Sequence, residues 1–111
     1  MASPTRWKMN KFRRGQLGTL SAKLARIEST GDKAALDECI NMLEDIKWDE
    51  EEYFDNMPEN LQGSMRGCES EEAIDNMDQA LDALNEAVES DNEDEFSDAV
   101  STAIEYIDDC I

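Results

Sequence analysis

The sequence predicts an all-α fold, a small antiparallel bundle of three to four helices with a basic N-terminal arm. A chain of 111 residues, 40% of them apolar, is long enough for one small domain with a modest core. Its apolar residues recur at alternating steps of three and four, which is the spacing of one face of an α-helix. Alanines at positions 73, 80 and 87 flank the clearest of these seams. Such small residues let neighbouring helices approach closely, which favours a compact bundle.

Four helices are predicted in order, over residues 17–30, 33–57, 66–89 and 92–110. Together they form a single acidic domain over residues 17–111, whereas residues 1–16 show no clean apolar period and are predicted to be an extended or weakly ordered arm. The apolar seams are Leu17, Leu20, Leu24 and Ile27; Leu36, Ile40, Leu43 and Ile46; Ile74, Met77, Leu81, Leu84 and Val88; and Phe96, Val100, Ala103, Ile107 and Cys110.

The breaks between the helices have recognisable signals. Gly31 is a natural end for the first helix, and Asp32 is a natural N-cap for the second. Pro58 ends the second helix, and the connector 58–69 holds this proline and two glycines. A polar run at 90–92 separates the last two helices.

Charge is distributed very unevenly along the chain. Residues 1–33 hold eight basic residues against two acids, a net charge of +6, whereas residues 34–111 hold two basic residues against 26 acids, a net charge of −24. The sum is the −18 of the whole chain. A basic head on a strongly acidic body indicates binding partners chosen by charge.

Several classes of function lack the residues that they need. The chain has no histidine, which excludes Ser-His-Asp and Cys-His nucleophilic pairs and the histidine-bearing zinc and di-iron sites. Its glycines match neither the P-loop nor the Rossmann spacing. Cys39, Cys68 and Cys110 are widely spaced, as is usual in a reducing compartment. We therefore expect a protein that is not an enzyme and that has no cofactor and no metal site.

The acidic body resembles nucleic acid in its charge density. One residue in three after position 33 is acidic, so three such helices side by side carry one negative charge per about 1.5 Å, against about 1.7 Å for duplex DNA. Many acidic surfaces serve only solubility, but these normally mix both signs. The predicted partner-binding residues are Trp48, Asp49, Glu51, Glu52, Tyr53, Asp55, Asp75, Asp78, Asp82 and Glu86.

Two features do not follow from building a bundle. Glu50 lies on the apolar seam of the second helix, and Asp108 and Asp109 lie at the negative end of the last helix dipole. Each would be relieved by a nearby cation, which the arm can supply. The basic residues of the arm are therefore predicted to neutralise the body, with a contact to nucleic acid as the alternative; they are Arg6, Lys8, Lys11, Arg13 and Arg14.

Five large apolar side chains gather around the end of the second helix: Trp48, Tyr53, Phe54, Met57 and Leu61. The favoured interpretation is that they close one end of the core. The alternative is an exposed anchor for a partner, with Trp48 and Tyr53 as the contacts.

The connector carries a resemblance to a known group of proteins. Its matching residues are Asp55, Asn56, Pro58, Glu59, Asn60, Leu61, Gln62 and Ser64, followed by Ala73, Ile74, Asp75 and Asn76. The stretch resembles a D-N-x-P-E-N-L-Q-x-S connector and an A-I-D-N helix in small, acidic helical proteins of Firmicutes phages and mobile elements. The resemblance covers about a third of the chain, and it implies a phage or mobile-element origin but no established activity.

These observations predict an acidic protein-binding inhibitor, such as an anti-CRISPR or other anti-defence protein, acting in the cytoplasm of a bacterial host cell. Its partner would be a basic host protein, a nucleic-acid-binding defence or DNA-processing enzyme, with no membrane contact and with homodimerisation left open. The alternative is a self-associating phage structural or regulatory protein whose basic arm contacts nucleic acid.

Overall fold

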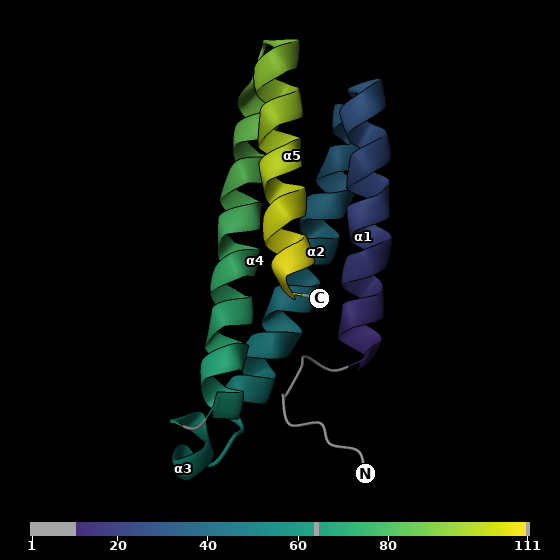
Figure 1. The fold of residues 1–111 in the computed structure, drawn as a ribbon. Helices are drawn as coiled ribbons and strands as arrows, with labels where there is room; N and C mark the ends of the chain where they lie inside the picture. The colour runs from purple at the N-terminus through teal and green to yellow at the C-terminus, as the bar shows by residue number, and fades with distance from the viewer. Residues whose placement is uncertain (1–10, 64, 111) are drawn as a thin grey trace.

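The computed structural model describes residues 11–63 and 65–110, and it confirms an all-α helical bundle (Figure 1). Four long helices run alternately up and down, and within the described ranges there is no β-strand. The helices are α1 (Lys11–Thr30), α2 (Lys33–Asp55), the short α3 (Glu59–Gln62), α4 (Met65–Glu89) and α5 (Glu93–Cys110). Around the bundle the order is α1, α2, α4, α5, so each long helix packs against two neighbours and α4 lies across from α1.

Most of the core comes from the seams that the spacing predicts, although Ile40, Ile74, Val88 and Cys110 of those seams are half-buried and Cys39 is buried outside them. Leu17, Leu20 and Leu24 of α1 are fully buried, and α2, α4 and α5 contribute matching rows. The alanines of α4 are buried too, which allows α4 and α5 to pack closely. The other fully buried large apolar residues are Leu36, Leu43, Ile46, Met77, Leu84, Val100 and Ile107.

Local signals fix both turns at the upper end of the bundle in Figure 1. Gly31 adopts a φ of 72°, which ends α1, and its amide donates to the Ile27 carbonyl at 2.7 Å. The Asp32 carboxylate caps α2 by accepting from two backbone amides at 3.1 and 3.2 Å. Lys33 Nζ donates to the Ser90 carbonyl at 2.5 Å, which ties the two turns together.

The predicted arm is wrong over residues 11–16, which form the first turns of α1. Arg13 lies four residues before Leu17, so it continues the inward-facing seam of α1 with a charged residue where the pattern calls for an apolar one. An apolar period therefore detects this helix only from Leu17 onward. Residues 1–10, with Arg6 and Lys8, lie outside the described residues.

A buried polar layer explains the charge on the seam of α2. Glu50 is 0% exposed; its Oε1 accepts from Arg13 Nε at 2.9 Å, and its Oε2 accepts from the Ser70 hydroxyl at 2.5 Å. The Arg13 guanidinium also lies 5.5 Å from the centroid of the Tyr53 ring. The prediction that the basic head neutralises Glu50 is confirmed, and three helices contribute to this layer.

At the end of α5 the same prediction stays untested, because residues 1–10 of the arm lie outside the described residues. Asp108 accepts a hydrogen bond from the Ser21 hydroxyl at 3.0 Å, so its described partner is a neutral donor from α1 and not a cation. A second bond of this kind joins the Ser97 hydroxyl to Glu28 at 3.0 Å. Two hydroxyl–carboxylate hydrogen bonds thus join α1 and α5.

The three cysteines should differ sharply in reactivity. Cys68 is exposed, whereas burial raises the pKa of Cys39, and burial together with the Asp109 and Glu50 carboxylates raises the pKa of Cys110 to about 12. Because the thiolate is the reactive form, a chromogenic disulfide reagent at pH 8 should titrate one thiol rapidly in the folded protein and three after unfolding. The Cys68→Ser variant should lose the rapid phase. Two or more rapid thiols in the folded protein would contradict the burial described here.

None of the described helices is both long and apolar enough to cross a bilayer.

Candidate partner-binding surface

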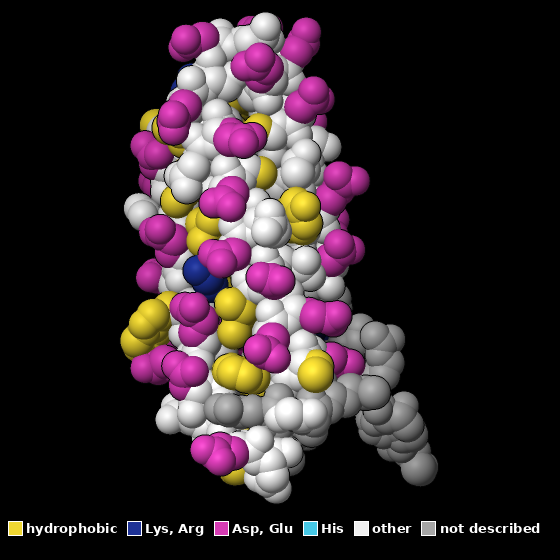
Figure 2. All heavy atoms as spheres, turned by 90° about the vertical axis from the view of Figure 1, so that its left-hand side faces the viewer, with side chains coloured by type: hydrophobic (Ala, Val, Ile, Leu, Met, Phe, Trp, Pro, Cys, Tyr) yellow, Lys and Arg dark blue, Asp and Glu magenta, His cyan; other side chains and the backbone are white. Residues whose placement is uncertain are grey.

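The outward side of α4 is a continuous row of carboxylates. Their steps of four, three, four, four and three follow the helical period, so all six project from one side of the helix. All are exposed, and the row spans about 27 Å at 1.5 Å per residue. We call this row the acidic ridge; it consists of Glu71, Asp75, Asp78, Asp82, Glu86 and Glu89. Figure 2 shows this face of the molecule, where acidic side chains extend over its full height and basic ones are scarce.

One lysine interrupts the ridge. Lys47 of α2 contacts Asp78 with Nζ 2.6 Å from Oδ1. The hydrogen bond from this ammonium to Asp78 raises the pKa of Lys47, and the charges of Asp78, Glu51 and Glu44 add to that effect. Asp78 is exposed and Lys47 is half-buried at the surface, so the pair joins α2 to α4 but contributes little to stability.

A groove lies between α2 and α4 at the lower end of the ridge. Its apolar lining is Trp48, Phe54 and Ile74, and its volume is about 490 Å³. The Trp48 side chain is 57% exposed, and it is the exposed large hydrophobic residue of the described chain. We call this the Trp48 groove; its acidic lining is Glu51, Glu52, Asp55, Glu71 and Asp75.

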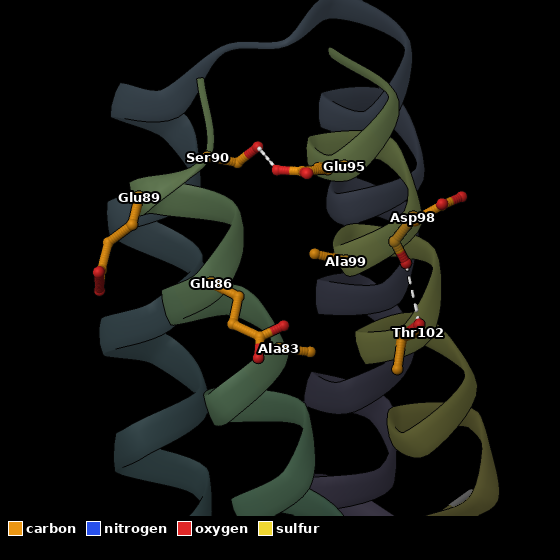
Figure 3. A pocket seen from close by; sticks show the side chains of 8 residues that line it. All are labelled: Ala83, Glu86, Glu89, Ser90, Glu95, Asp98, Ala99 and Thr102. Carbon is orange, nitrogen blue, oxygen red and sulfur yellow. Dashed lines mark hydrogen bonds between the residues drawn. The ribbon is translucent and has the colours of Figure 1, made fainter. Parts of the chain in front are cut away.

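A second groove lies between α4 and α5 at the upper end of the ridge, with a volume of about 500 Å³ (Figure 3). Ala83 and Ala99 project from facing helices, and their small side chains leave the space between the two ribbons open. Glu86 lies over this space, whereas Glu89 points away from it. The remaining lining residues are Ser90, Glu95, Asp98 and Thr102.

The structure brings most of the predicted site residues together. Five of them meet in the Trp48 groove, and three continue along the ridge; these are Trp48, Glu51, Glu52, Asp55 and Asp75, and then Asp78, Asp82 and Glu86. Sequence reasoning missed Glu71 and Glu89, although both continue the same spacing at either end of the predicted row. It also missed Ile74 and Phe54 as groove residues.

Two predicted contacts lie elsewhere. The Tyr53 ring is half-buried beneath Arg13, on the side of α2 that faces α1. Asp49 comes one turn before Tyr53 and two turns after Met42, which lines a small cleft between α1 and α2, so it projects to the same side. Tyr53 therefore faces away from the Trp48 groove, and Asp49, which is exposed, projects about 100° around α2 from Trp48 and does not line it.

The aromatic cluster divides between core and surface. Met57 is buried, and Tyr53 and Phe54 are half-buried. The prediction that the cluster closes one end of the core therefore holds for the residues from Tyr53 to Met57. For Trp48 that interpretation is wrong, because its indole is exposed. The side chain of Leu61 lies outside the described residues.

The basic residues predicted to neutralise the body lie in different environments. Arg13 is committed to Glu50 inside the bundle, and Arg14 is half-buried beside it. The side chain of Lys11 is outside the described part of the chain. Among the side chains that the structure describes, no three acidic or cysteine groups are placed to hold a metal ion.

No family model matches this chain, and no curated protein or solved structure is significantly similar to it. The resemblance of the connector to proteins of phages and mobile elements therefore stays a prediction.

Proposed function

We propose that this protein is an acidic inhibitor of phage or mobile-element origin that occupies the basic, nucleic-acid-binding surface of a host protein, as an anti-CRISPR or other anti-defence protein does. The observation that carries the proposal is the segregation of charge among the helices. α2 has nine acids and two basic residues, α4 has eight and one, and α5 has seven and none, so each has a net charge of −7. α1 has five basic residues and one acid, a net charge of +4.

This segregation supports mimicry rather than solubility alone. The three acidic helices hold 24 carboxylates in a molecule 47 Å long, one per about 2 Å, against one per about 1.7 Å of duplex DNA. A surface that serves only solubility intersperses both signs. Here α1 holds five of the eight basic residues in 11–110, and the ridge on the opposite helix presents carboxylates to an approaching protein.

The inhibitor is expected to act without catalysing a reaction: its charge attracts the basic partner, and once bound it excludes nucleic acid from the partner's binding surface. Its charge would accelerate association with a basic groove and suppress association with acidic proteins. Once bound, the ridge would satisfy the lysines and arginines that otherwise contact phosphates. Binding of the inhibitor and binding of nucleic acid to the partner would then be mutually exclusive.

The test has two stages. The tagged protein is used to capture proteins from nuclease-treated bacterial lysate, with washes at low and then high salt. Each basic protein that is retained at low salt and released at high salt is purified and mixed with its nucleic acid. We expect a stoichiometric amount of inhibitor to displace the nucleic acid, as measured by fluorescence anisotropy.

Two results would overturn the proposal. One is a captured protein that holds its nucleic acid equally well with the inhibitor bound. The other is direct binding of nucleic acid by the purified protein at physiological salt, lost on deletion of residues 1–10, which would favour the self-associating alternative; this deletion leaves α1 and the Arg13–Glu50 pair in place.

A further inference from the structure

The Trp48 groove combines two features that a solvated acidic face does not need. An exposed indole is one, since the other large hydrophobic side chains of the described bundle are wholly or partly buried. The second is the convergence of five carboxylates around it, from two helices. Aromatic side chains in such a position are typical binding anchors.

The residues that line the Trp48 groove favour one type of side chain as its ligand. An apolar group would cover the indole but would also remove carboxylates from water without pairing them, which is strongly unfavourable. A lysine ammonium would pair with a carboxylate, but it is compact and strongly hydrated and has no flat face for the ring. An arginine guanidinium is planar and weakly hydrated; it stacks on an indole while its edge donates to carboxylates.

The protein already binds an arginine of its own in this way. On the opposite side of α2, the Arg13 guanidinium lies 5.5 Å from the centroid of the Tyr53 ring while its Nε donates to Glu50 at 2.9 Å. An aromatic ring and a carboxylate three residues apart on one helix thus hold one guanidinium. On the outward side Trp48 is followed by Glu51 three residues later and by Glu52 four residues later, so a ring and a carboxylate again lie one turn apart, in the reverse order along the helix.

We propose that the Trp48 groove takes an arginine side chain from a basic segment of the partner protein, stacked on the Trp48 indole and paired with the surrounding carboxylates. This inference rests on the proposed function for the existence of a basic partner. It adds that the partner is recognised by arginine specifically and not by positive charge alone.

The probes are two peptides of equal charge, nine arginines and nine lysines, titrated by calorimetry into the full-length protein. We expect the arginine peptide to bind about tenfold more tightly than the lysine peptide. In the Trp48→Ala variant this ratio should fall to about two, because the stacking surface is lost and the guanidinium keeps only the advantage of bidentate pairing with carboxylates. Trp48→Phe, which keeps an aromatic face, should retain most of the preference.

A second measurement does not depend on removing Trp48. In a Trp7→Phe background Trp48 is the one remaining tryptophan, and its emission should change with the arginine peptide at concentrations where the lysine peptide has no effect. An equal response to both peptides, or a preference unchanged in a folded Trp48→Ala variant, would overturn the proposal.

Failure of the arginine-groove proposal can be distinguished from failure of the proposed inhibitor function. If Trp48→Ala displaces nucleic acid from the captured partner as effectively as the parent, the groove assignment fails and the inhibitor role stands. If the arginine preference depends on Trp48 but no captured protein loses its nucleic acid, the groove assignment stands and the inhibitor role fails.

Discussion

Arg13→Ala should lower the free energy of unfolding by about 3–5 kcal/mol, because it leaves the Glu50 carboxylate buried without its cation. Glu50 is 0% exposed, and its remaining described partner would be the Ser70 hydroxyl. A domain of this size has a total stability of about 5–15 kcal/mol, so the loss is a large fraction of it. Urea unfolding followed by circular dichroism measures the change.

Two further variants decide whether the loss comes from the buried charge. Arg26→Ala removes an exposed arginine from the same helix and should change the stability by less than about 0.5 kcal/mol. Replacing both partners, Arg13→Leu with Glu50→Leu, should recover most of the loss, because apolar side chains substitute well for a buried ion pair. A cost below about 1 kcal/mol for Arg13→Ala would show that Glu50 reaches water in solution.

The helical seams were predictable because the burial of one helix face imposes its period on the sequence. The same method failed at Arg13, where the seam continues with a charge. Glu50 signalled the missing cation, since an acid on an apolar seam needs a partner. Its second partner, Ser70, could not be predicted, because a lone serine on a seam is neither unusual nor costly.

The candidate surface was only partly predictable, for a geometric reason. Trp48 lies two residues after Ile46 and two before Glu50, both buried, so it projects about 200° away from each of them. The angular position of Trp48 on the helix therefore places its indole at the surface. The concentration of apolar residues around it in the sequence suggests instead that it belongs to the core. Tyr53 comes five residues after Trp48, about 140° around the helix, so it faces α1, where Arg13 lies over its ring.

The acidic ridge should determine affinity for the partner. A triple variant, Asp75→Asn, Asp82→Asn and Glu86→Gln, removes three exposed ridge charges and leaves the Lys47–Asp78 pair in place. If each lost pair weakens binding by roughly fivefold, the dissociation constant for the captured host protein should rise by roughly 100-fold. The association rate should also fall and depend less on salt, as measured by surface plasmon resonance from 50 to 500 mM NaCl.

A control variant with the same change in net charge distinguishes binding through the acidic ridge from attraction by the overall charge of the protein. Glu38→Gln, Asp45→Asn and Asp94→Asn together raise the net charge by the same three units, and all three residues are exposed away from the ridge. Because the field of the whole molecule falls equally in both triple variants, net charge alone predicts equal losses. A contact through the ridge predicts a loss in the control of less than about a tenth of that in the ridge variant. Thermal unfolding should show no loss of stability in the ridge variant, because removing like charges from one helix face relieves repulsion. Equal losses of affinity in the two variants would mean that acidity acts at long range and that the ridge is not the contact.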